Sequence, residues 1–104
     1  MTKFGLNDKI IELINNYFKN IEQIKTVKIF GSRTTGTYRN GSDIDLVLYF
    51  NKEHQNNYNL ISKIKYELDE LNTPYQFDII EYNSLTNQEL INHINIYGKI
   101  LYNK

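Results

Sequence analysis

Apolar side chains return every three or four residues in three separate stretches of the chain. Residues 7–20 place isoleucines and aromatics at this spacing with polar residues between them, which predicts an amphipathic helix with one face in the core. The same pattern over residues 60–71 predicts a second helix, which Pro74 stops because its ring cannot continue the helical backbone. Residues 87–97 repeat the pattern, and Gly98 can end this third helix.

Two of these helices are preceded by residues suited to capping. Asn7 comes before the first helix and can accept a hydrogen bond from a free N–H group of the first turn. Before the third helix, Thr86 and Glu89 have the spacing of a capping box. The sequence therefore predicts Thr86 as the N-cap residue of the last helix.

Three shorter stretches are rich in β-branched and aromatic residues and predict strands over residues 24–30, 44–50 and 75–82. The second of them is apolar on both faces beyond its first residues, which is typical of an interior strand. Residues 31–42 show no apolar period and contain several turn-forming residues, so they predict a loop. A short apolar tail, residues 100–102, is expected to pack against the body. The predicted order is α-β-loop-β-α-β-α, an α/β fold.

Composition narrows the class of protein. The chain has 104 residues, 40% of them hydrophobic, which predicts one globular domain. Twelve basic and twelve acidic side chains balance, so direct nucleic-acid binding is not expected. There is no cysteine, hence no disulfide, thiolate metal site or cysteine nucleophile. No apolar run approaches the roughly 20 residues of a membrane span, and the first residues lack a signal-peptide core, so a cytoplasmic location without membrane contact is expected.

Three aspartates are candidates for metal-dependent chemistry. Asp43 and Asp45 stand two residues apart, so their side chains leave the same face of a strand, with Cα atoms roughly 6–7 Å apart. Two such carboxylates can share a pair of Mg²⁺ ions spaced about 3.5–4 Å, an arrangement that assists phosphoryl transfer. Asp78 falls in the middle of the third strand, where an unpaired carboxylate is costly to bury. A role as third metal ligand would explain it, and it could also accept a proton from an acceptor hydroxyl.

Each of these aspartates also has an ordinary structural explanation. An Asp-x-Asp pair is common where a turn leads into a strand, and Ser42 with Asp43 could simply finish that turn. Asp78 could face solvent from a half-exposed strand. Spacing alone leaves both alternatives open.

The predicted loop carries candidate phosphate-binding groups. Gly31 ends the first strand and lets the backbone approach a phosphate closely, while the following N–H groups and the Ser32 hydroxyl are donors. Arg33 and Arg39 are the only arginines in the chain, and a guanidinium matches phosphate oxygens in geometry. An ordinary strand-ending turn with solvated loop charges is the alternative.

Two histidines are the remaining side chains that commonly bind metals. His54 and His93 have no partner at the spacing of metal ligands. Both are therefore predicted to be solvated residues on the protein surface.

Together these residues resemble a known signature. Gly31-Ser32-Arg33, Gly36 and Arg39, followed by Ser42-Asp43-Ile44-Asp45-Leu46, are similar to the signature of minimal nucleotidyltransferases, small members of the DNA polymerase β superfamily. Asp78 falls where that family has its third aspartate. The resemblance extends over nearly the whole chain. It implies one nucleotidyltransferase domain over residues 1–104, with a small mixed sheet flanked by helices (an α+β arrangement).

The resemblance also implies an activity. Such proteins transfer a nucleoside monophosphate, usually AMP from ATP, to a hydroxyl and release pyrophosphate. By position, Asp43 and Asp45 would hold two Mg²⁺ ions and Asp78 the catalytic one. The nucleotide-binding residues would be Gly31, Ser32, Arg33, Arg39 and Ser42. Similar minimal proteins are the antitoxins of HEPN–MNT pairs, in which the antitoxin adenylylates a tyrosine of the toxin RNase, so a HEPN toxin and a hetero-oligomer are the implied partner and assembly.

One departure from the family pattern concerns the phosphate loop. Many members read Gly-Ser-Arg-Ala-Arg-Gly, whereas Thr34 and Thr35 fill the fourth and fifth places here. The missing cation at position 35 could weaken phosphate binding or shift that task to Arg39. The metal-binding aspartates are unaffected, so this departure bears on rate more than on reaction class.

Two other functions stay open from the sequence. The protein could neutralise a toxin by binding alone, with catalysis dispensable. It could also modify a small-molecule hydroxyl, with an oligomer neighbour completing the pocket. A protein acceptor is favoured because the chain shows no helical acceptor-binding domain of the kind used by larger relatives.

Overall fold

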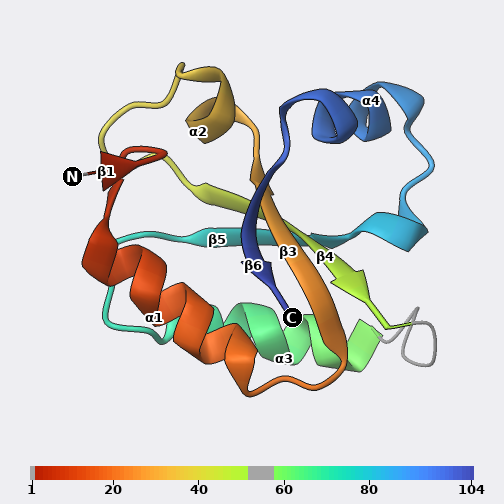
Figure 1. The fold of residues 1–104 in the computed structure, drawn as a ribbon, viewed down its shortest axis with the longest axis horizontal. Helices are drawn as coiled ribbons and strands as arrows, with labels where there is room; N and C mark the ends of the chain where they lie inside the picture. The colour runs from red at the N-terminus through yellow and green to blue at the C-terminus, as the bar shows by residue number, and fades with distance from the viewer. Residues whose placement is uncertain (1, 52–57) are drawn as a thin grey trace.

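A computed structural model describes residues 2–51 and 58–104 and contains a four-stranded mixed sheet (Figure 1). The strands lie in the order β5-β4-β3-β6. Their bounds are β3 (Ile24–Phe30), β4 (Ile44–Phe50), β5 (Phe77–Glu81) and β6 (Lys99–Asn103). β3 pairs antiparallel with both β4 and β6, while β4 pairs parallel with β5. The predicted mixed sheet is confirmed, and β4 is the interior strand that its two apolar faces indicated.

Helices flank this sheet on two sides. α1 and α3 cover one face, and α2 and α4 lie on the opposite side (Figure 1). Their bounds are α1 (Asp8–Lys19), α2 (Ser32–Thr35), α3 (Tyr58–Asp69) and α4 (Gln88–Tyr97). Tyr17 Oη donates a hydrogen bond of 2.7 Å to Glu67 Oε1, which joins α1 to α3. No described helix is long and apolar enough to cross a bilayer.

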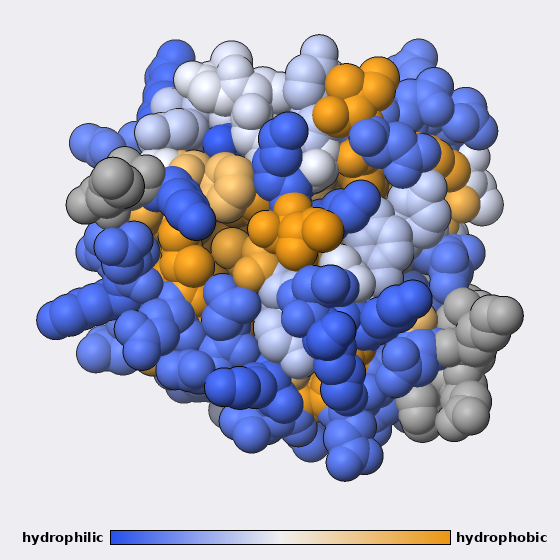
Figure 2. All heavy atoms as spheres, viewed as in Figure 1, coloured by the Kyte–Doolittle hydropathy of each residue, from blue (hydrophilic) through white to orange (hydrophobic). Residues whose placement is uncertain are grey.

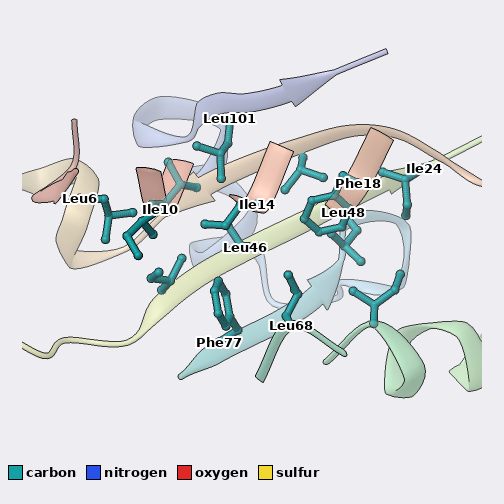
Figure 3. Close-up of a cluster of buried hydrophobic side chains, with 14 of the residues drawn as sticks. Leu6, Ile10, Ile14, Phe18, Ile24, Leu46, Leu48, Leu68, Phe77 and Leu101 are labelled. Carbon is teal, nitrogen blue, oxygen red and sulfur yellow. The ribbon is translucent and has the colours of Figure 1, made fainter. Parts of the chain in front are cut away.

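The main core lies between the sheet and the α1–α3 pair. Alternate residues of β4, among them Leu46 and Leu48, point toward this side and are fully buried (Figure 3). Ile14 and Phe18 of α1 and Leu68 of α3 belong to the same buried cluster. Because side chains alternate along a strand, Asp45, Val47 and Tyr49 face the other side of the sheet. The opposite face of β4 is therefore available for polar groups.

Most element boundaries follow the sequence pattern closely. β3 and β4 span the residues predicted for the first two strands. Asn7 caps α1 as predicted, since its Oδ1 accepts a hydrogen bond from Ile10 N–H at 3.0 Å. The predicted cap of the last helix is wrong by one residue. Asn87, not Thr86, is the N-cap, since Asn87 Oδ1 accepts from Leu90 N–H at 3.1 Å. An asparagine caps as well as a threonine, so the backbone geometry decided between neighbours.

Five short elements of the described residues were not predicted. The N-terminal hairpin consists of β1 (Thr2–Lys3) and β2 (Leu6–Asn7), and a 3₁₀ turn, η2 (Tyr82–Ser84), follows β5. α2 forms inside the predicted loop, and the apolar tail becomes the edge strand β6. Elements of two to five residues carry too few positions to show a period. The sequence expectation of a tail packed on the body was correct, but its strand pairing depended on β3.

The surface viewed in Figure 2 is mostly hydrophilic, with separate groups of apolar side chains over the region of α4, over the region of β6, and toward the N-terminal hairpin and α1. Three of the exposed large apolar side chains in the described part of the chain come from α4 and β6, namely Ile96, Tyr97 and Ile100. Ile96 and Ile100 are 67% and 59% exposed.

Candidate active site

Asp45 and Asp78 lie side by side on the face of the sheet opposite the main core. They are direct partners in the parallel register of β4 and β5, so their side chains leave the same face. Burial first, and then the neighbouring carboxyls of Asp78 and Asp43, raise the pKa of Asp45 to about 6, against a smaller lowering by Arg33. The interaction with Asp78 favours the protonated form of Asp45, which is why the pKa of Asp45 rises rather than falls. The structure thus brings the three predicted aspartates into one electrostatic cluster.

This cluster has the donor chemistry of a Mg²⁺ site. Carboxylate oxygens are ligands that Mg²⁺ prefers, with water and substrate phosphate completing its shell. The mutual repulsion that raises the pKa of Asp45 is the interaction that a divalent cation would relieve. Within the described residues, however, no three histidine, cysteine, aspartate or glutamate side chains stand in the arrangement of a formed metal site. Asp43 and Asp78 are not buried, so their side chains have room to turn toward an ion.

Gly31 faces this cluster from the end of β3. Its φ of 79° lies in the left-handed region, and a Cβ placed there would collide with Asp45 Oδ2. Its carbonyl accepts hydrogen bonds from Thr34 N–H at 3.1 Å and Thr35 N–H at 3.2 Å, which closes the turn of α2. We call residues 31–36 the Gly-Ser turn. Glycine is required here for conformation and for the close approach to Asp45.

Replacing Gly31 with alanine is expected to destabilise the protein by about 2–3 kcal/mol, from backbone strain together with displacement of the Asp45 carboxylate. Gly36→Ala is the matched control, since Gly36 has a φ of 83° but no neighbouring atom within 4 Å of the place that a Cβ would take. Gly36→Ala should therefore show the strain alone, about 1 kcal/mol. Urea unfolding of both variants measures the difference. Equal destabilisation would show that Gly31 and Asp45 are not in close contact.

The other predicted loop residues have different environments. Ser32 is half-buried at the first position of α2, beside Gly31. Ser42 Oγ accepts a hydrogen bond of 2.8 Å from Arg39 N–H, so this hydroxyl helps to form the loop. Arg39 is exposed, and its guanidinium remains a candidate phosphate ligand.

Arg33 is not placed as the sequence predicted. It is only 4% exposed, and its terminal nitrogens donate to Phe4 O at 2.8 Å and Ser42 O at 2.7 Å. Its guanidinium lies over the rings of Tyr38 and Tyr75, at 5.2 and 4.9 Å from their centroids. The guanidinium is buried, with both terminal nitrogens engaged and Nε also buried, so the structure argues against the predicted phosphate contact. Arg33 joins the N-terminal hairpin to the segment that leads into β4.

His93 is also placed differently. It is half-buried on α4, and its Nε2 accepts a hydrogen bond of 3.1 Å from Gly31 N–H. The prediction of a solvated surface histidine is wrong for His93, while His54 lies outside the described residues. The only signal in the sequence was Tyr97, four residues later and on the same helix face. That pairing does not reveal a contact with a residue 62 positions away.

Comparison with known proteins shows the family and agrees with the fold. The family model described as polymerase beta, nucleotidyltransferase matches residues 12–104. The chain therefore belongs to the polymerase β nucleotidyltransferase family. No curated protein sequence matches it.

Solved structures show the same fold at low sequence identity. A toxin–antitoxin structure with AMP-PNP is similar with a TM-score of 0.59 and 23% identity, over 95% of this chain and 75% of that one. A protein assigned as a nucleotidyltransferase from Sulfolobus solfataricus gives 0.61 and 16%, over 92% and 79%. A structure of the toxin–antitoxin MntA-HepT gives 0.55 and 18%, over 94% and 74%. At these identities the likeness concerns the fold.

Proposed function

We propose that this protein is a Mg²⁺-dependent nucleotidyltransferase that moves AMP from ATP to a hydroxyl, most simply a tyrosine, of a HEPN toxin RNase and thereby acts as its antitoxin. The observation that carries this proposal is that Asp45 and Asp78 are direct partners in the sheet and that Asp45 lies against Gly31 of the Gly-Ser turn. Membership of the nucleotidyltransferase family supports the reaction class. The likeness of the fold to toxin–antitoxin structures, one with AMP-PNP, supports the toxin partner and the nucleotide.

In this proposal the three aspartates would hold two Mg²⁺ ions, Asp43 and Asp45 both of them and Asp78 the catalytic one. The ions would neutralise charge on the phosphates and lower the pKa of the attacking hydroxyl. The acceptor oxygen attacks the α-phosphorus, the bond to the β-phosphate bridging oxygen breaks, and pyrophosphate leaves. An Asp78 carboxylate oxygen takes the hydroxyl proton. Ser32 and the exposed Arg39 would contact the phosphates.

A protein acceptor suits the surface as well. Ile96, Tyr97 and Ile100 are exposed on the side of the sheet that carries the carboxylates. The rings of Tyr97 and His93 have centroids 5.1 Å apart, and His93 is hydrogen-bonded to Gly31, so Tyr97 is linked to the Gly-Ser turn through His93.

Neutralisation by binding alone is the second candidate. The observation that favours it is the exposure of Ile96, Tyr97 and Ile100, which a bound toxin could cover without any chemistry. In that case the aspartates would be dispensable for protection of the cell.

Labelled ATP distinguishes the two candidates. The protein, Mg²⁺ and the purified product of the neighbouring gene are incubated with ATP labelled at either the α- or the γ-phosphate. Transfer of the α-label alone to the partner is expected, and Asp43→Ala should reduce it by roughly a thousandfold because a metal ligand is lost. Asp78→Asn should still bind nucleotide but turn over poorly. If Asp43→Ala transfers no label yet protects cells as well as the parent protein, binding alone is the function.

A further inference from the structure

His93 connects α4 to the Gly-Ser turn through one directed hydrogen bond. Gly31 N–H donates to His93 Nε2 at 3.1 Å. A neutral imidazole accepts at one ring nitrogen only, so this bond requires the proton to be on Nδ1. The contact therefore fixes both the tautomer of His93 and the orientation of the peptide between Phe30 and Gly31.

Aromatic neighbours hold the imidazole in place. The ring of His93 lies 6.2 Å from Phe30 at an angle of 75° and 5.1 Å from Tyr97 at 44°. Phe30 is the last residue of β3, so the imidazole contacts two consecutive residues at the end of that strand. α4 is thus joined to this strand end by ring packing and by a hydrogen bond.

Rotation of the peptide between Phe30 and Gly31 would disturb the Asp45 carboxylate. The carbonyl of Gly31 is bonded to the N–H groups of Thr34 and Thr35, and its Cα lies against Asp45 Oδ2. With its N–H engaged by His93, every polar group of Gly31 is fixed. Because Gly31 N–H donates to His93, Ser32 is the first residue of the turn that can donate to a phosphate.

We propose that His93 is a positioning residue that holds the Gly-Ser turn in the orientation that receives the nucleotide phosphates. The ligand in this inference rests on the proposed function, whereas the contact between His93 and Gly31 does not. The hydrogen bond of the imidazole is made to the turn and not to a carboxylate. Its loss should therefore raise the KM for ATP and leave kcat nearly unchanged.

Two substitutions separate the hydrogen bond from the ring packing. His93→Phe keeps an aromatic ring against Phe30 and Tyr97 but has no acceptor. His93→Gln loses the ring but carries an amide oxygen at about the reach of Nε2. We measure the dissociation constant of AMP-PNP with Mg²⁺, the KM and kcat for ATP, and amide hydrogen exchange at Gly31 by NMR.

Weaker binding of AMP-PNP by His93→Phe is expected, by about five- to tenfold for one lost hydrogen bond, together with faster exchange at Gly31. His93→Gln should stay within about twofold of the parent protein in affinity. The reverse order would overturn the inference, because ring packing would then be what matters. Tighter binding by His93→Phe would overturn it too, since the imidazole would then compete with phosphate for the amide.

The same measurements separate this inference from the proposed function. If the parent protein itself does not bind AMP-PNP with Mg²⁺, the proposed function fails and the ligand named here fails with it. If the parent protein binds and His93→Phe binds equally well, the proposed function stands and the positioning role of His93 is refuted. In either case, exchange at Gly31 reports whether the contact exists.

Discussion

Asp45→Asn is expected to abolish nucleotidyl transfer and, at the same time, to stabilise the metal-free protein. Transfer should fall by roughly a thousandfold, because the variant loses the central carboxylate of the proposed metal site. Stability should rise at neutral pH, because the burial of Asp45 and the charges of Asp78 and Asp43 all oppose its ionisation there. An uncharged amide of nearly the same shape removes that repulsion.

The sign of the pH dependence follows from the direction of the shift. The pKa of Asp45 in the folded protein is raised to about 6, above its ordinary value of 3.8. The folded state therefore binds this proton more tightly than the unfolded state does. The resulting stabilisation is fully present below about pH 4 and is lost as the pH rises through about 6. Asp45→Asn should lack this dependence.

Thermal unfolding in EDTA from pH 4 to 8, beside the transfer assay, measures both effects. Asp43→Asn is the matched control, because Asp43 is a less buried member of the same cluster. It should lose transfer activity but change the unfolding temperature less than Asp45→Asn does. Added Mg²⁺ should stabilise the parent protein more than Asp45→Asn. An unfolding temperature of Asp45→Asn at or below that of the parent protein at pH 8 would show that the carboxylates do not repel each other as inferred.

Arg33→Ala is expected to be the most destabilising of the arginine substitutions, at about 3 kcal/mol. It leaves the carbonyls of Phe4 and Ser42 without their donor, at about 1–3 kcal/mol for each unsatisfied group. It also removes the cation between Tyr38 and Tyr75, worth about 0.5–2 kcal/mol. For a protein of this length, the midpoint of thermal unfolding should fall by roughly 10–20 °C.

Arg33→Lys and Arg39→Ala are the controls. A lysine ammonium cannot span both carbonyls or stack as a plane, so Arg33→Lys should recover only part of the loss. Arg39→Ala changes an exposed side chain and should stay within about 0.5 kcal/mol of the parent protein. If Arg33→Ala kept the parent unfolding temperature but bound AMP-PNP weakly, the phosphate contact that the sequence predicted would be correct after all.

The sequence predicted those parts of the fold that depend on neighbouring residues. Period and β-branching fixed the bounds of β3 and β4, because a buried strand face needs apolar side chains at alternate positions. The cap at Asn7 was predicted for the same reason, since it joins residues only three positions apart. Thr86 was chosen over Asn87 because two adjacent capping residues look alike until the path of the backbone is known.

In the candidate site, too, the sequence predicted the local features and the structure decided the contacts between distant residues. The spacing of Asp43 and Asp45 was sufficient to predict that they share a face, and the family resemblance pointed to Asp78. The direct pairing of Asp45 with Asp78 depends on the parallel register of β4 and β5, which a helix separates in sequence. The guanidinium of Arg33 has the chemistry of a phosphate ligand, but its burial between two tyrosines gives it a structural role.

By itself the sequence determined the main helices and strands and the reaction class that its motif implies, and it predicted the three acidic residues, because each of these is encoded over a few consecutive positions or in a recognisable signature. Only the tertiary structure decided that Arg33 joins the N-terminal hairpin to β4, that His93 holds the Gly31 amide, and that Gly31 lies against Asp45. Those contacts join residues that are distant along the chain. Their energies depend on burial and orientation, which exist only once the sheet and its helices have packed together.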